Sequence, residues 1–219
     1  RTPLISIDYI NNLLESKVFF KCENLQKTGS FKFRGAINKI TKFSKDLKKN
    51  GVIAYSSGNH AQAVALASYQ NNISAKIVMP NNAPKIKIQN TKNYEAEVVL
   101  YDHLSEKREE LAENIAMKEK RTLIRPYEDY DIIAGQGTAA IEIVKDLNEL
   151  SLIPDIYLCC CGGGGLIAGT STYLKNVFPN IKCYSVEPEE FNDTKLSLEK
   201  RKIVKNKPDA KSFCDALLA

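Results

Sequence analysis

Short apolar runs alternate with longer amphipathic segments along most of the chain. From Gly51 onward, the pattern predicts strands at 52–55, 74–79, 95–101, 122–125, 156–161 and 181–186, separated by helices at 61–69, 84–93, 104–120, 132–150 and 166–177. Strands that alternate with helices in this way favour an α/β fold, with parallel-rich sheets and helices on both faces. Before Gly51, an extended start leads to a short helix at 7–16, a strand at 18–22 and a helix after Ser30, which is a good N-cap.

The helix after Ser30 has a lysine that helix stability does not explain. Its apolar positions, which we expect to be buried, are Ala36, Ile37, Ile40, Phe43 and Leu47. Lys32 lies in the first turn, where a positive charge opposes the helix dipole. Phe31 and Phe33 flank it, and an apolar setting favours the neutral amine. Lys32 is therefore a candidate for chemistry, and the alternative is a surface lysine whose charged end reaches solvent.

Four successive glycines, Gly162, Gly163, Gly164 and Gly165, join an apolar run of strand length to a helix. Such a turn leaves backbone N–H groups unpaired at the positive end of the helix dipole, and glycine lets an anion approach the backbone. The pattern therefore predicts a phosphate-binding turn. The sequence has no Gly-x-x-x-x-Gly-Lys-Ser/Thr motif, which excludes an ATP-hydrolysing P-loop. A dinucleotide-binding turn remains an alternative interpretation, because Gly163, Gly165 and Ala168 fit its pattern and Glu187 lies where an acid would bind the ribose.

Three glycine-containing loops fall at or just beyond predicted strand ends, where α/β sheets bind their ligands. They are residues 27–32, 56–60 and 162–165. The first carries an amine, the second two hydroxyls, an amide and an imidazole, and the third a phosphate-binding turn. Together they describe a site for pyridoxal 5′-phosphate, whose aldehyde forms a Schiff base with a desolvated lysine while its ring takes up carbanion charge.

Composition narrows the class of protein. With 219 residues, 43% of them hydrophobic, the chain can bury the core of one large domain or two small ones. Its net charge of +5 is spread along the chain without interleaved aromatic residues, so we expect a solvated lysine surface rather than a nucleic-acid-binding face. No apolar run approaches about 18 residues, and the sequence shows no hydrophobic region of signal-peptide type, so we expect a soluble cytoplasmic protein that does not bind a membrane.

The cysteines and the chain ends add two expectations. The six cysteines show no metal-ligand spacing, which indicates reduced thiols. The sequence opens at Arg1 rather than at methionine and stops at Ala219 within what looks like an element, so we expect a fragment of a longer protein.

Five motifs, in order, are GSFKFRGA, SSGNHAQA, DIIAGQGT, CGGGGLIAG and SVEP. As a set they resemble the serine racemase and threonine dehydratase family of pyridoxal-phosphate enzymes, which have the tryptophan synthase β-like fold (fold type II). The resemblance runs from Arg1 to about Ala219. With it we predict a large cofactor-binding domain at 1–54 and 132–219, a small inserted domain at 55–131, and a homodimer.

The resemblance implies roles for the matching residues. Lys32 would be the Schiff-base lysine and the acid/base on one face of the substrate Cα. Ser57 would be the proton donor on the opposite face, which racemisation needs, although it could be simply a turn hydroxyl. Asn59 would bond the ring hydroxyl of the cofactor, and Gly162 to Gly165 would hold its phosphate. The residues around the substrate carboxylate would be Ser56, Asn59 and His60.

The resemblance also implies a divalent cation and an effector. Magnesium or calcium would bind the carboxylates of Glu187 and Asp193 and the carbonyl of Phe191, and the alternative is an exposed acidic turn. ATP, an allosteric effector of some racemases, would bind at positions Lys27, Thr28, Gln62 and Tyr94. Glu95 departs from the glycine common after that tyrosine, and Tyr127 stands where racemases often have asparagine or phenylalanine beside the ring.

We therefore expect an enzyme that racemises serine and also eliminates water from serine or threonine, giving pyruvate or 2-oxobutanoate plus ammonia. A threonine, serine or hydroxyaspartate ammonia-lyase without racemase activity is the alternative. Biosynthetic threonine dehydratases usually have alanine in place of Ser57, which favours the racemase, although many eliminating enzymes keep this serine. More remote alternatives are a nicotinamide-dependent oxidoreductase and a catalytically dead cofactor-binding paralogue. Family members continue past Ala219 and there supply the partner of the pyridine nitrogen, so the visible chain alone could be inactive.

Overall fold

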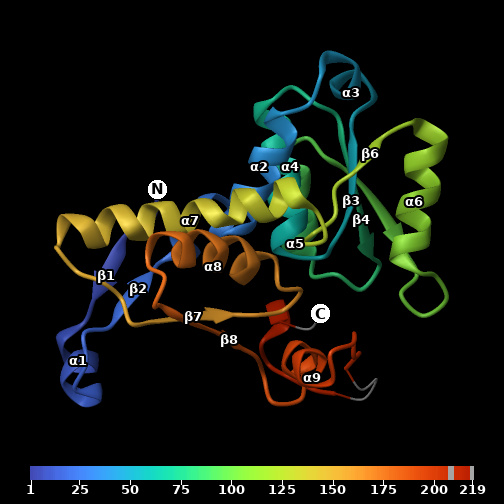
Figure 1. Cartoon of the computed structure of the whole chain (residues 1–219). Helices are drawn as coiled ribbons and strands as arrows, with labels where there is room; N and C mark the ends of the chain where they lie inside the picture. The colour runs from blue at the N-terminus through green and yellow to red at the C-terminus, as the bar shows by residue number, and fades with distance from the viewer. Residues whose placement is uncertain (207–209, 218–219) are drawn as a thin grey trace. The chain divides into compact units, whose positions relative to one another are not determined.

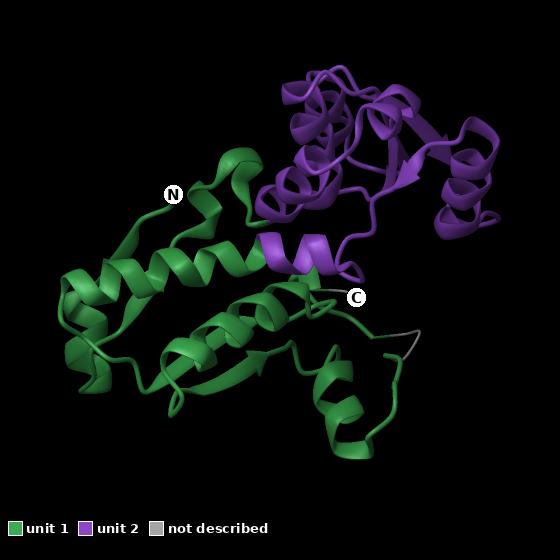
Figure 2. Cartoon of the chain, turned by 45° about the horizontal axis from the view of Figure 1, so that its top comes forward, with its two compact units in different colours: residues 1–31, 136–219 green, residues 32–135 purple. Residues whose placement is uncertain are grey.

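The computed structural model describes residues 1–206 and 210–217, which belong to two compact units (Figure 2). One unit combines residues 1–31 with 136–219, and the other spans 32–135. The domain boundaries at 54/55 and 131/132 remain a prediction, and the predicted end of the large domain at Ala219 lies outside the described residues.

The unit of residues 32–135 is built on a four-stranded parallel sheet. Its strands, in spatial order, are β5 (Glu97–Tyr101), β4 (Ala75–Pro80), β3 (Val52–Tyr55) and β6 (Thr122–Leu123). Its complete helices are α2 (Lys32–Thr41), α3 (Lys45–Asn50), α4 (Asn59–Gln70), α5 (Lys85–Lys92) and α6 (Arg108–Glu119). The first turns of α7 (Tyr130–Glu149) also belong to this unit.

Both faces of this sheet are covered, as Figure 1 shows. In β3, Val52 and Ala54 join the core formed with α2, α4 and α5, whereas Ile53 and Tyr55 join the smaller core formed with α6. Successive residues of a strand point to opposite faces, so a strand apolar at every position must be covered twice. The predicted α/β class, with parallel strands between helices, is confirmed.

The unit of residues 1–31 and 136–219 holds two small sheets. Strands β1 (Leu4–Ser6) and β2 (Phe19–Lys21) pair antiparallel around α1 (Asp8–Leu14), and strands β7 (Ile156–Cys160) and β8 (Lys182–Val186) pair parallel through α8 (Gly165–Val177). The main core of this unit lies between α7 and α8 and includes Val144, Leu147 and Leu174. Among the described residues of this unit, the remaining elements are α9 (Asp193–Lys200) and 3₁₀ turns at Glu23–Leu25, Lys27–Gly29 and Asp215–Leu217.

The predicted helix after Ser30 is wrong in two respects. The chain forms two helices there, because the Ser44 side chain accepts the backbone N–H of Leu47 at 3.4 Å and starts α3. Leu47 is consequently 42% exposed instead of buried. The buried hydroxyl of Ser30 has no hydrogen-bond partner within the described residues, so it does not cap α2.

The helix predicted from Leu104 also starts later than expected, at Arg108. The Asp102 carboxylate accepts hydrogen bonds from the backbone N–H of Leu104 and the hydroxyl of Ser105, at 3.1 and 2.7 Å. Side chains of aspartate compete with the helix in this way, and the local turn replaces its first residues.

Two glycines of α7 lie where another backbone comes close. A Cβ added at Gly135 would lie 2.5 Å from the carbonyl oxygen of Arg34, and one added at Gly137 would lie 2.9 Å from that of Gly169. Both distances are too short for a side chain, so close packing of helices explains the glycines. Across the described residues, no helix has the length and apolar character needed to span a membrane.

Candidate active site

The Lys32 amine lies against a backbone carbonyl at the start of α2. Its Nζ donates to the carbonyl oxygen of Pro126 at 2.9 Å and lies 5.8 Å from the centroid of the Tyr127 ring. Burial lowers the pKa of Lys32 from 10.5 to about 8. The expectation that the setting of Lys32 favours the neutral amine is confirmed, and the neutral amine is the nucleophilic form.

His60 lies beside this amine in the first turn of α4. Its Nε2 is 2.9 Å from the carbonyl oxygen of Ile124, so Nε2 carries the proton and donates it. Burial and the positive charge of Lys32 lower the pKa of His60 to about 3, although the hydrogen bond to Ile124 raises it. His60 is therefore neutral near pH 7, and the segment of residues 124–127 contacts both His60 and Lys32.

The loop that follows β3 presents the remaining predicted substrate-binding groups. The Ser56 hydroxyl accepts the backbone N–H of Gly58 at 3.1 Å, Ser57 is partly exposed, and Asn59 is exposed at the first position of α4. No side chain of the described residues caps α4, so its first N–H groups are available to an anion such as a substrate carboxylate. The structure thus brings Lys32 and His60 together and places the Ser56–Asn59 loop directly before His60.

The glycine turn joins β7 to α8 in the other unit. The backbone N–H of Cys161 donates to the carbonyl oxygen of Val186 at 2.9 Å and so continues the pairing of β7 with β8. Gly164 has a φ of 78°, which a residue with a side chain adopts only under strain, and α8 begins at Gly165 without a side-chain cap from the described chain. The N-terminus of α8 therefore fits a phosphate, as the sequence predicts.

Two buried hydroxyls near Lys32 in the sequence lack partners. Neither Thr28 Oγ1 nor Ser30 Oγ makes a hydrogen bond within the described part of the chain. An unpaired buried hydroxyl costs roughly 1–3 kcal/mol, and such groups call for an explanation. A polar ligand beside this segment would supply partners, which fits a phosphorylated cofactor or a nucleotide. Nothing in the sequence pattern indicated that these hydroxyls would be buried.

The residues predicted to bind a cation lie at the start of α9. The two carboxylate oxygens of Glu187 accept the backbone N–H groups of Thr194 and Lys195, both at 2.9 Å, and Asp193 accepts a hydrogen bond from Asn206, also at 2.9 Å. Each oxygen keeps a lone pair, so these hard ligands still fit Mg²⁺ or Ca²⁺. No group of three or more His, Cys, Asp or Glu side chains that could hold a metal occurs among the described residues.

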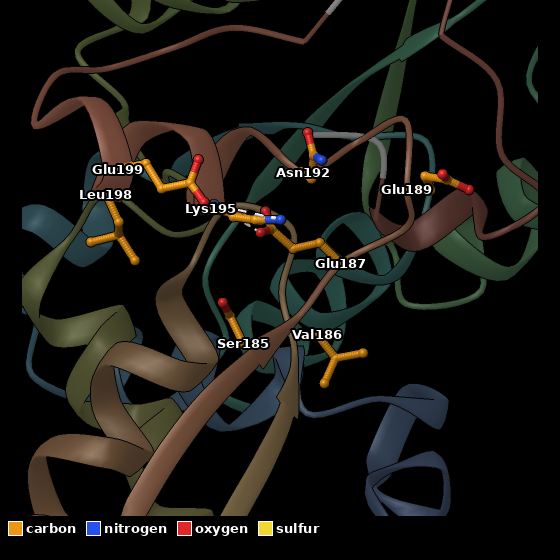
Figure 3. Close-up of a pocket in the computed structure, with 8 residues that line it drawn as sticks. All are labelled: Ser185, Val186, Glu187, Glu189, Asn192, Lys195, Leu198 and Glu199. Carbon is orange, nitrogen blue, oxygen red and sulfur yellow. Dashed lines mark hydrogen bonds and ion pairs between the residues drawn. The ribbon is translucent and has the colours of Figure 1, made fainter.

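A pocket of about 600 Å³ opens between β8 and α9, next to Glu187 (Figure 3). The residues that line it are Ser185, Val186, Glu187, Glu189, Asn192, Lys195, Leu198 and Glu199. The pocket therefore includes one predicted cation ligand but neither Lys32 nor the glycine turn.

The predicted effector residues fall in both units. Exposed Lys27 and partly buried Thr28 belong to a 3₁₀ turn in one unit, with Thr28 at a φ of 61°. Gln62 of α4 and Tyr94, just after α5, are partly buried in the other. Glu95 has a φ of 58°, a conformation that glycine adopts without strain, which accounts for glycine being common there.

Comparisons with known proteins agree on one family. A family model described as pyridoxal-phosphate dependent enzyme matches residues 1–218. Serine racemase of Schizosaccharomyces pombe is 43% identical over 204 residues, which cover 93% of this chain and 62% of that protein. L-threo-3-hydroxyaspartate ammonia-lyase of Saccharomyces cerevisiae is 40% identical over 204 residues, covering 93% and 61%. The solved structure of maize serine racemase aligns with a TM-score of 0.93 and 36% identity, covering 100% of this chain and 65% of that one. This chain thus spans about three fifths of its curated relatives.

Proposed function

Because the chain belongs to the family of pyridoxal-phosphate dependent enzymes, we propose that the whole protein racemises serine and also eliminates water from serine or threonine. The elimination would release pyruvate or 2-oxobutanoate together with ammonia. Similarity to serine racemases from S. pombe and maize supports this proposal. Because of the family match, we assign the glycine turn to the phosphate of pyridoxal phosphate and not to a dinucleotide.

The proposal assigns the cofactor to residues that fit it. The amine of Lys32 would hold pyridoxal phosphate covalently, Gly162 to Gly165 would bind its phosphate through backbone N–H groups, and Asn59 would bond its ring hydroxyl. When bound, the cofactor supplies an electron sink for charge that develops at the substrate Cα.

Two side chains would move protons at the Cα. Lys32 would take the proton from one face, and Ser57 would deliver one to the opposite face, which inverts the centre. Ser56, Asn59 and neutral His60 would surround the substrate carboxylate, together with the N–H groups at the start of α4. Elimination also begins with the first proton transfer, and the β-hydroxyl then takes up a proton and leaves as water, so no donor on the second face is needed and the same residues can support both reactions.

The observation that carries the proposal is the state of the Lys32 amine. Burial brings its pKa to about 8, within reach of neutral pH, and its neighbour His60 stays uncharged. A base whose pKa lies near the working pH is the most effective proton-transfer group. A surface lysine in an ion pair would have neither property.

An ammonia-lyase without racemase activity is the second candidate. The 40% identity to the S. cerevisiae hydroxyaspartate ammonia-lyase favours it. Ser57 favours the racemase, because inversion needs a proton donor on the second face and elimination does not.

Incubating the full-length protein with L-serine and measuring D-serine and pyruvate separately distinguishes the two candidates. Formation of both products supports the racemase, and pyruvate alone supports the lyase. Ser57→Ala should reduce racemisation far more than elimination, whereas Ser105→Ala, a change in a surface turn of the same unit, should alter neither. Equal loss of both activities in Ser57→Ala would contradict the role given to Ser57.

Four further properties are proposed, the first three from the resemblance and the location from the sequence composition. A Mg²⁺ or Ca²⁺ ion would bind near Glu187, Phe191 and Asp193. ATP would act as an effector through Lys27, Thr28, Gln62 and Tyr94. The protein would be a homodimer and would lie in the cytoplasm.

A further inference from the structure

The loop between β6 and α7 supplies the groups that contact the Lys32 amine. The carbonyl oxygen of Pro126 accepts the amine at 2.9 Å, and the ring of Tyr127 lies next to it, 5.8 Å from centroid to Nζ. The acceptor is a backbone atom, so its position depends on how the loop is held and not on which side chain stands at residue 126. Whatever fixes the loop therefore fixes the surroundings of Lys32.

The carboxylate of Asp129, at the end of this loop, connects the loop to α2 and to the start of α7. Asp129 Oδ2 accepts from Lys39 Nζ on α2 at 2.6 Å, and Asp129 Oδ1 accepts the backbone N–H groups of Asp131 and Ile132 at 2.9 and 3.2 Å. The same side chain thus pairs with α2 and caps the start of α7.

The Lys39–Asp129 pair is shielded from solvent. The two side chains are 15% and 19% exposed, so water and salt screen their attraction less than that of a surface pair. Burial raises the pKa of Asp129, but the hydrogen bonds from Lys39 and the backbone outweigh it and leave the pKa below its ordinary value. Asp129 is therefore charged near pH 7.

A second ion pair, to Asp131 in the first turn of α7, is more exposed to solvent. Lys42 and Asp131 are 2.7 Å apart with side chains 53% and 42% exposed, so this pair faces solvent and is expected to contribute little. Lys42 directly follows α2 and pairs with the same segment of the chain as Lys39, so Lys42 is a nearby, exposed control for Lys39.

Lys32 and Lys39 belong to one helix and are seven residues apart, which is about two turns or about 10 Å along α2. The loop bridges these two points, with Pro126 at Lys32 and Asp129 at Lys39. We propose that Asp129, paired with Lys39, is a positioning residue that holds the Pro126 carbonyl and the Tyr127 ring around the Lys32 amine. The proposal rests on the proposed function only for the role of Lys32, since the contacts themselves involve no substrate.

Two titratable side chains lie beside the amine, one from α4 and one from the loop. They are His60, which is neutral, and the phenol of Tyr127. Shielding of the amine from water is the largest cause of its depressed pKa. Releasing the loop therefore admits water and raises the pKa of Lys32 towards 10.5, since hydration favours the charged form.

The test measures the protonation of Lys32 directly, without cofactor or substrate. The full chain, freed of bound aldehyde, is trace-labelled with acetic anhydride from about pH 6 to about pH 11, and the labelled peptide is quantified by mass spectrometry. We expect half-maximal labelling of Lys32 near pH 8 in the parent. In Lys39→Met the midpoint should rise by about one pH unit or more, whereas Lys42→Met should keep the parent midpoint.

Two more variants separate positioning from general support of the fold. Asp129→Asn keeps an oxygen that can cap α7 but weakens the pair with Lys39, so the midpoint of Lys32 labelling should also rise. Lys39→Arg keeps the positive charge that pairs with Asp129, so this single variant should have the parent midpoint. Midpoints that stay at the parent value in both Lys39→Met and Asp129→Asn, in folded protein, would overturn the proposal. A parent that labels like an ordinary lysine would instead remove the basis of the proposed function, so the two failures can be told apart.

Discussion

Replacing Lys32 should make the protein more stable, in a way that depends on pH. The pKa of the buried amine is about 8 in the folded protein and 10.5 when unperturbed, a difference of about 2.5. Each unit is worth about 1.36 kcal/mol, so holding the charged amine in this site costs up to about 3 kcal/mol. Met has similar length without the charge, so Lys32→Met should be more stable by up to this amount below about pH 8.

The direction with pH follows from the depressed pKa. Between about pH 8 and pH 10.5 the unfolded chain keeps a proton on Lys32 that the folded protein has lost, so the parent gains stability as the pH rises through this window. Above it, both states are neutral and the penalty is gone. The advantage of Lys32→Met should therefore disappear by about pH 10.5.

Urea unfolding of the cofactor-free proteins at several pH values measures the difference in the free energy of unfolding between the parent and Lys32→Met. Lys45→Met removes an exposed lysine of α3 and controls for general effects of losing a charge. A stability difference between the parent and Lys32→Met that is constant from pH 8 to pH 10.5 would refute the burial of the amine, because only its titration produces the slope.

Three other changes test packing, polar burial and the proposed cation. Gly135→Ala should destabilise the protein by about 2 kcal/mol, measured by urea unfolding, because the added Cβ would lie 2.5 Å from a backbone oxygen of α2. The strain exceeds the gain in helix propensity, which is about 1 kcal/mol. A variant as stable as the parent would contradict this. Ser68→Ala should stabilise by about 1 kcal/mol, since its buried hydroxyl has no partner in the described structure, and a loss of stability by thermal unfolding would argue against that. Adding Ca²⁺ or Mg²⁺ should raise the melting temperature of the parent but not that of Glu187→Gln. The glutamine keeps an oxygen that can cap α9. An equal rise in both proteins would exclude Glu187 as a ligand.

The elements that the sequence predicts well are those specified by their own residues. Strand β3 is apolar at each position and was predicted with its observed bounds, and the motif set led to fold type II, which the family match and the maize structure confirm. The errors came from polar side chains that act locally. Ser44 starts a new helix and exposes Leu47, and Asp102 delays the start of α6. Helix α9 was not predicted, because its start is fixed by Glu187 from the preceding strand end.

The candidate site shows the same division. Lys32, His60 and the glycine turn could be found from residue type and spacing, and the flanking phenylalanines predicted an apolar setting, which agrees with the depressed pKa that burial gives Lys32. The partner of its amine could not be found in this way, because it is a backbone carbonyl 94 residues away. No side-chain pattern identifies such an acceptor. Its position depends on tertiary contacts such as the pair of Lys39 and Asp129.

The role proposed for Lys32 is tested most directly by finding which amine the cofactor is attached to. The full-length protein is incubated with pyridoxal phosphate, reduced with borohydride and digested, and the peptides are sequenced by mass spectrometry. We expect a phosphopyridoxyl group on Lys32 and loss of the yellow colour on reduction. A group on another amine, or none in protein that remains folded, would contradict that role.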